Sequence, residues 1–154
     1  MLTVGKDERA FSLLELVLVL LLLGVSMLIV VPNISKGLDD RKVRGSALGL
    51  AAAARDLRSR ALSDGMAQEL VVNSLQNSYL VGRMREIHLP ADVKFVAVEG
   101  GESLDRDRKK FYFFPNGSSL GGEIVLADND QANAYYIRVE PLTGKIEVAR
   151  GNPS

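Results

Sequence analysis

The 154-residue sequence has no cysteine, no tryptophan and one histidine, His88. Without cysteine there is no disulfide and no cysteine-based metal site. His88 has no second histidine to share a metal with, so we expect it on the surface or on an edge strand. Ser118 or Ser119 would need a neighbouring base to act as a nucleophile. We therefore predict no metal site, no cofactor and no catalytic residues, and we do not expect an enzyme.

An excess of charge of either sign is also missing, because 19 basic residues balance 19 acidic residues. A neutral chain has no global field to attract DNA, so we expect no nucleic-acid partner. Two local basic clusters need an interpretation, Arg55 with Arg58 and Arg60, and the segment 106–110, which Asp107 interrupts. In both, a solvated face is favoured over DNA binding.

A long apolar run is present near the start, from Phe11 to Val31, and Glu15 is its only charged residue. As a helix rising ~1.5 Å per residue, it would cover ~30 Å of hydrocarbon. Lys6 and Arg9 precede it, which favours a cytoplasmic N-terminus with the remaining chain on the far side. The run is longer than a secretory signal and lacks an A-x-A cleavage pattern. We predict a transmembrane segment at 11–31, and a plain uncleaved signal anchor stays open.

The residues Ala10-Phe11-Ser12-Leu13-Leu14-Glu15-Leu16 resemble the class III signal of type IV prepilins and type II secretion pseudopilins. Alanine stands at position 10, where the family usually has glycine. The resemblance implies a leader at 1–10, cleavage between Ala10 and Phe11 by a prepilin peptidase, and N-methylation of Phe11. Pro32 matches the family's proline at the end of the apolar half of the helix, where we expect a kink.

Glu15 needs a partner, because an ionised carboxylate in lipid costs several kcal/mol unless it is paired. One interpretation pairs it with its own Phe11 amine or with the positive end of the helix dipole. The family resemblance implies instead that Glu15 meets the Phe11 amine of a neighbouring subunit during assembly. We favour this second pairing and predict that Glu15 is an assembly residue.

Beyond Pro32, small and apolar residues recur at three- and four-residue steps, which predicts an amphipathic helix over 32–64 that ends near Gly65. The stripe consists of Ala47, Leu50, Ala54, Leu57 and Ala61. Short β-like runs then indicate a periplasmic antiparallel β domain at 65–154. The expected strands are Gln68–Asn73, Ser78–Met84, Val93–Val98, Lys110–Phe114, Glu123–Ala127, Tyr135–Glu140 and Lys145–Ala149. We expect an exposed loop from Gly100 to Lys110 and a terminal hairpin around residues 141–144.

Residues 113–126, with 136–139 and 143–146, are similar to the C-terminal domain of GspH/FimT-like minor pseudopilins. The resemblance implies an α+β, pilin-like fold, in which a long N-terminal helix packs on small antiparallel sheets. DNA-uptake relatives carry Gly-Arg-x-Arg where this chain has Gly144-Lys145-Ile146-Glu147. The loop 116–122 is expected to be a turn and not a phosphate cradle. The aromatic run 111–114 is expected to be a buried central strand with Tyr112 at one edge, with an exposed contact surface as its alternative.

The resemblances imply a minor pseudopilin of a type II secretion system, located near the pseudopilus tip and helping to export folded proteins across the outer membrane. We expect a single-pass inner-membrane protein with a periplasmic C-terminal domain. Its expected partners are a prepilin peptidase, other minor and major pseudopilins, the inner-membrane assembly platform and the lipid bilayer. The alternative is a FimT- or FimU-like minor pilin of a type IV pilus, with DNA uptake as a further role. A membrane-anchored periplasmic enzyme or ligand-binding module is a third hypothesis.

Overall fold

The computed structural model describes residues 12–151, with side chains described for all of them except 28–36. The chain divides into two compact units, Met1–Gly37 and Leu38–Ser154, which we describe separately. One helix, α1, runs from Leu13 to Asp64 and contributes to both units. In the described part of the chain, nine strands follow it, all in the second unit.

In the first unit, α1 begins directly after Ser12, whose carbonyl accepts the first helical hydrogen bond from the Leu16 amide at 3.1 Å. The described side chains from Leu13 to Met27 are exposed and almost all apolar. Within the described residues, no helix meets the combined length and apolarity required to span a membrane. Phe11 and the side chains of residues 28–31, which complete the predicted span, lie outside this description. The transmembrane segment therefore stays a prediction.

In the second unit, the small-residue stripe makes α1 the centre of the core. Every stripe residue predicted from the sequence is at most 1% exposed, and Val43 and Ala51 lie on the same buried face. The helix ends at Asp64, and Gly65 follows with a left-handed φ of 66°, which suits glycine at a helix terminus. The predicted end of the helix is therefore confirmed.

The first sheet has five antiparallel strands in the order β3-β2-β1-β6-β5. The strands are β1 Gln68–Asn73, β2 Ser78–Val81, β3 Arg85–His88, β5 Glu102–Ser103 and β6 Arg108–Phe113. The prediction of one strand over 78–84 was wrong, because the chain turns at Gly82, where φ is 63°, and returns as β3. The predicted loop 100–110 was also partly wrong, since β5 and the start of β6 lie within it.

The second sheet has four antiparallel strands in the order β4-β7-β8-β9. They are β4 Val93–Gly100, β7 Gly122–Asp128, β8 Ala134–Val139 and β9 Ile146–Gly151. The predicted terminal hairpin is confirmed, with Val139 opposite Ile146. The other predicted strands of this sheet agree with the observed ones to within two residues at each end.

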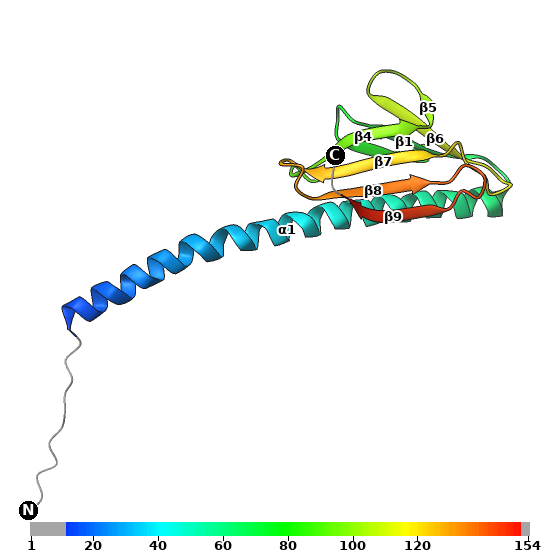
Figure 1. The fold of residues 1–154 in the computed structure, drawn as a ribbon. Helices are drawn as coiled ribbons and strands as arrows, with labels where there is room; N and C mark the ends of the chain where they lie inside the picture. Colours follow the sequence, from blue (N-terminus) through cyan, green and yellow to red (C-terminus); the bar gives the residue numbers. More distant parts are fainter. Residues whose placement is uncertain (1–11, 152–154) are drawn as a thin grey trace, which may run out of the picture. The chain divides into compact units, whose positions relative to one another are not determined.

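The core fills the space between α1 and the two sheets, which lie along this part of the helix (Figure 1). Phe111 and Phe113 enter it from β6 and are the largest fully buried side chains. Tyr79 packs against α1 where Gly49 leaves room, with its hydroxyl 3.9 Å from the position that a β-carbon of Gly49 would occupy. The pilin-like α+β fold expected from the sequence is confirmed in this unit.

The importance of the stripe is measurable by comparing two leucines on α1. Leu50 is 0% exposed, whereas Leu48 is 44% exposed. Leu50→Ala should lower the free energy of unfolding by ~2–5 kcal/mol, because it removes buried methyl groups and leaves a cavity. Leu48→Ala should change it by less than ~1 kcal/mol. Urea unfolding of the full chain in mild detergent, followed by tyrosine fluorescence, gives both values, and equal losses would contradict the assignment.

Candidate assembly surfaces

The residues of the N-terminal signal are only partly described. Ala10 and Phe11, the predicted cleavage and methylation site, lie outside the described residues. Glu15 lies in the first turn of α1 and is exposed. It stands three residues after Ser12, which is the spacing of a capping box and also suits a carboxylate at the positive end of a helix dipole. Pro32 lies inside α1 among the undescribed side chains, so its kink stays a prediction.

Ion pairs and hydrogen bonds tie the start of the domain's helix to the sheets. Asp40 Oδ1 accepts a hydrogen bond from the Tyr135 hydroxyl at 3.2 Å and lies 3.2 Å from the Arg150 guanidinium. Burial raises the pKa of Tyr135, and the hydrogen bond to Asp40 raises it further. Two residues on, Lys42 pairs with Asp92 at 2.6 Å. Strand β9 and the loop before β4 are thus held to α1.

Two arginines of the cluster Arg55, Arg58 and Arg60 bind the sheets at the other end of the domain. The Arg58 Nε donates to the Thr143 carbonyl at 3.0 Å and to the Gly117 carbonyl at 3.4 Å. Arg55 donates to the Ile146 carbonyl at 3.1 Å. The solvated-face prediction was therefore incomplete, because these cations bind backbone carbonyls of two loops and of the first residue of β9. Arg60 does fit that prediction, since it is exposed and pairs with Asp56 at 2.8 Å.

The loop 116–122 is a turn that its own polar groups hold together. Asn116 Oδ1 accepts hydrogen bonds from the Ser118 amide at 3.0 Å and from its hydroxyl at 2.7 Å. Residues 117–121 spell Gly-x-Ser-x-Gly, the pattern of a hydrolase nucleophile elbow. Here, however, the segment joins two strands, and the Ser119 hydroxyl donates to the Glu140 carbonyl at 3.0 Å. Such a serine is a structural link between loops.

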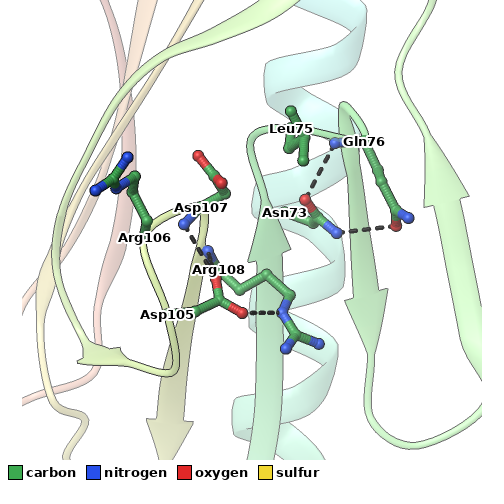
Figure 2. Close-up of a pocket in the computed structure, with 7 residues that line it drawn as sticks. All are labelled: Asn73, Leu75, Gln76, Asp105, Arg106, Asp107 and Arg108. Atoms are coloured by element: carbon green, nitrogen blue, oxygen red, sulfur yellow. Dashed lines mark hydrogen bonds and ion pairs between the residues drawn. The ribbon is translucent and has the colours of Figure 1, made fainter.

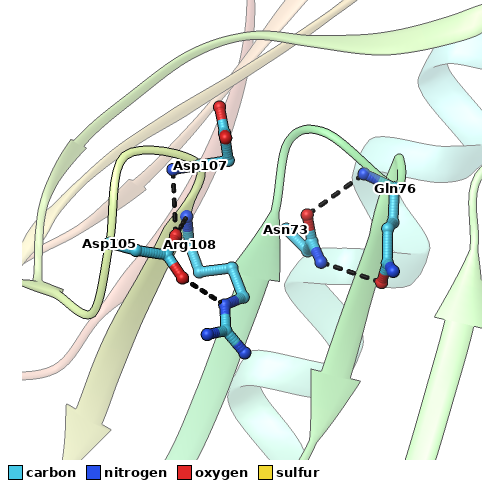
Figure 3. A network of polar contacts seen from close by, with 5 residues as sticks. All are labelled: Asn73, Gln76, Asp105, Asp107 and Arg108. Atoms are coloured by element: carbon cyan, nitrogen blue, oxygen red, sulfur yellow. Dashed lines mark hydrogen bonds and ion pairs between the residues drawn. The ribbon is translucent and has the colours of Figure 1, made fainter.

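Arg106 and Arg108 of the second basic cluster line a polar hollow of about 320 Å³ beside acidic neighbours (Figure 2). Arg108 pairs with Asp105 at 2.6 Å, and the Asp105 carboxylate also accepts from the amides of Asp107 and Arg108 (Figure 3). The hydrogen bond from the Arg108 side chain is the main cause that lowers the pKa of Asp105. Opposite, Asn73 and Gln76 hydrogen-bond to each other. The cations here are thus interleaved with acids.

A basic residue is also paired with an acid in the segment Gly144-Lys145-Ile146-Glu147, where Glu147 stands at the position of the second arginine of Gly-Arg-x-Arg. Lys145 Nζ lies 2.5 Å from the Glu147 carboxylate. This hydrogen bond is the main cause that raises the pKa of Lys145 and lowers that of Glu147. His88 lies exposed on the edge strand β3, as expected. Among the described residues, no group of three or more histidine, cysteine or acidic side chains is arranged to hold a metal ion.

The aromatic run on β6 is split between the two faces of its sheet. Phe111 and Phe113 are buried, as predicted for a core strand, but Tyr112 and Phe114 lie on the outer face, half-buried. Their rings stack with centroids 6.2 Å apart and planes 18° apart. The period-2 alternation of a strand would have separated these pairs at the sequence level. The core interpretation therefore holds for one pair only.

The outer pair forms the floor of an open hollow of about 490 Å³, which we call the aromatic patch. Its lining residues are Ala67, Gly101, Glu102, Tyr112, Phe114 and Leu120. Lys110 lies at its margin, with its Nζ 5.3 Å from the centroid of Tyr112 and 3.3 Å from the Glu69 carboxylate. The patch is more apolar than the hollow beside Asp105 and Arg108. An exposed apolar hollow with a polar margin is typical of a protein contact site.

Comparison with known proteins gives a consistent picture. No protein-family model matches the chain. The chain is 27% identical over 145 residues to a type II secretion system protein H of Xanthomonas campestris pv. campestris, covering 93% of this chain and 84% of that one. Its fold is similar to the minor pseudopilin EpsH from the type 2 secretion system of Vibrio cholerae, with a TM-score of 0.58 and 11% identity, covering 71% of this chain and 97% of that one.

The type IV minor pilin FimU of Pseudomonas aeruginosa is also similar, with a TM-score of 0.54 and 13% identity over 71% of this chain and 89% of that one. At these identities the two structural likenesses show a common fold. Together with the protein H relative, they confirm the resemblance to GspH/FimT-like minor pseudopilins that the sequence predicted.

The role of Arg58 in holding the two loops can be tested against Arg60. Arg58→Ala leaves the Thr143 and Gly117 carbonyls without their donor, so we expect a loss of ~1–3 kcal/mol in the free energy of unfolding. Arg60→Ala removes an exposed ion pair and should cost ~0–1 kcal/mol. Hydrogen exchange of the amides of residues 117–121 and 143–145 should accelerate in the first variant alone. Unchanged exchange in Arg58→Ala would show that the loops hold without it.

Proposed function

We propose that this chain is an H-type minor pseudopilin of a type II secretion system, acting in the periplasm as a structural subunit. The observation that carries the proposal is the similarity to a type II secretion system protein H along 93% of the chain. The pilin-like domain and the signal-like segment 10–16 support it independently. Its function is assembly into a short pseudopilus near the tip, which helps to move folded proteins across the outer membrane.

The N-terminal segment supplies the anchor in this proposal. A prepilin peptidase cleaves between Ala10 and Phe11, the new Phe11 amine is methylated, and the apolar run 11–31 holds the chain in the inner membrane by a single pass. Because a carboxylate in lipid needs a partner, Glu15 pairs with the Phe11 amine of an adjacent subunit as that subunit enters the filament. The second unit is then displayed in the periplasm.

The partners follow from this role. Other minor and major pseudopilins contact the helix and the domain, and the inner-membrane assembly platform receives the processed chain. Several of the domain's cations, among them Arg58, Arg108 and Lys145, bind backbone carbonyls or pair with acids, so contacts between domains rest on apolar surface and hydrogen bonds more than on a basic field.

A minor pilin of a type IV pilus is the second candidate, favoured by the likeness to FimU. The fold does not separate the two, since its likenesses to EpsH and FimU have similar scores. The relative in sequence is a secretion protein, which favours secretion. DNA uptake is less well supported, because the position of the relatives' second arginine is Glu147, which neutralises Lys145.

The proposal is tested by an in-frame deletion of the gene. We expect exoproteins to accumulate in the periplasm of the deletion strain and to reach the medium again on complementation, with piliation and DNA uptake unchanged. The measurement is the exoprotein ratio between medium and periplasm. Normal secretion together with lost piliation would transfer the role to a type IV pilus.

The Glu15 carboxylate should matter for assembly and not for insertion. In Glu15→Ala, we expect normal recovery in the membrane fraction but a several-fold loss of the chain from purified pseudopili, because the amine of the neighbour loses its counter-ion. Ser26→Ala is the matched control, since the Ser26 hydroxyl donates a hydrogen bond to the Leu22 carbonyl of its own helix. Wild-type recovery of Glu15→Ala in pseudopili would reject the pairing.

A further inference from the structure

We infer that the aromatic patch is a docking site for one loop of a neighbouring pseudopilin, which inserts an aromatic or long aliphatic side chain adjacent to a lysine or arginine. The inference rests on the proposed function and deepens it by naming the contact surface and the chemistry of its occupant.

The patch is a built hollow and not a gap left by poor packing. Its floor is the stacked pair Tyr112 and Phe114. One wall is the loop before β7, where the Leu120 amide donates to the Tyr112 carbonyl at 3.2 Å. The opposite wall begins at Gly101, whose amide donates to the Gly121 carbonyl at 3.1 Å. A β-carbon at Gly101 would lie 2.8 Å from the Lys110 carbonyl, so position 101 has no room for a side chain.

The hollow is left uncovered by the described part of the chain. Strand β5 is two residues long and pairs only with Lys109 and Lys110 of β6, so it does not extend along the edge as far as Tyr112. Leu120 remains 42% exposed at the margin, and Tyr112 and Phe114 are half-buried. Tyrosine and other aromatic side chains in such a position supply large contact area at a low cost in conformational entropy. The missing component is therefore an apolar group.

The charges at the margin specify a cation beside that group. Glu102 is the one charged lining residue, and its carboxylate makes no hydrogen bond or ion pair with any side chain that the structure describes. Lys110 lies opposite Glu102 in the β5 and β6 pairing, but its ammonium is held by Glu69 and the Tyr112 ring. An incoming lysine or arginine would satisfy Glu102 at the edge of an apolar contact, where water is partly excluded.

The size of the patch argues for a neighbour in a filament and against a free dimer. Six lining residues are far fewer than the ~20–30 residues on each side of a stable independent interface. A subunit that is already held through its helix is present at high effective concentration, so a small contact is enough to fix how its domain sits. A second copy of this chain binding on its own would lack that advantage.

The occupant can be identified by photo-crosslinking. We would place p-benzoylphenylalanine at Leu120 of the full chain in the complemented deletion strain, with the same probe at Met84, which is 95% exposed in the β2–β3 turn, as the control. We expect position 120 to crosslink to a different pseudopilin, within a few residues of a lysine or arginine. Crosslinks only to a second copy of this chain, equal labelling from both positions, or no adduct at position 120 would overturn the inference.

Two substitutions test the apolar and the charged part separately. Leu120→Glu and Glu102→Lys should each lower exoprotein release about tenfold, the factor that corresponds to ~1.4 kcal/mol. Met84→Glu and Glu99→Lys, which change exposed residues outside the patch, should release exoprotein like the wild type. If the deletion strain itself secretes normally, the proposed function fails. If it does not secrete and both patch variants do, the docking site alone is wrong.

Discussion

The close approach of α1 to the two sheets is the constraint on which the rest of the domain depends. It is possible because the helix face toward the sheets carries alanine and leucine at three- and four-residue steps, each at most 1% exposed. A larger residue in place of one of these alanines would separate the layers and leave Phe111 and Phe113 without their packing partners. The inward face of β6 is thus dictated by the helix, and its outward face is free to carry Tyr112 and Phe114.

Much of this arrangement could be predicted from the sequence, because it is periodic. The stripe from Ala47 to Ala61 identified the buried helix face, and the alternation from Tyr135 to Val148 identified the terminal hairpin. The strand predicted over 78–84 failed because a single glycine, Gly82, turns the chain there, and a lone glycine in a strand pattern can equally mark a bulge within one continuous strand. The strand β5 was missed because Glu102 and Ser103 have no strand-like pattern, and only their pairing with Lys110 and Lys109 makes them one.

The candidate surfaces were harder to predict, since they depend on contacts between distant parts of the chain. Arg55 and Arg58 appeared to be the solvated side of an amphipathic helix, but the carbonyls that they bind lie about sixty to ninety positions later. No local pattern marks such a pairing. The aromatic run 111–114 suggested a buried central strand with Tyr112 at one edge, because hydrophobicity alone does not distinguish the two faces of a strand. The alternation between faces does, once the run is known to be in a sheet.

The polar contacts between α1 and the sheets determine where the surface of the domain lies relative to the helix face. Asp40 and Lys42 hold the sheets near the point where the domain begins, and Arg55 and Arg58 hold them near the helix end. Together with the buried stripe, these two separated attachments fix the orientation of the sheets on the domain's part of the helix. In the proposed filament, a neighbour that contacts the domain's part of α1, from Leu38 onward, therefore meets the aromatic patch in a fixed orientation, and a small contact there would select one neighbour among several with the same anchor.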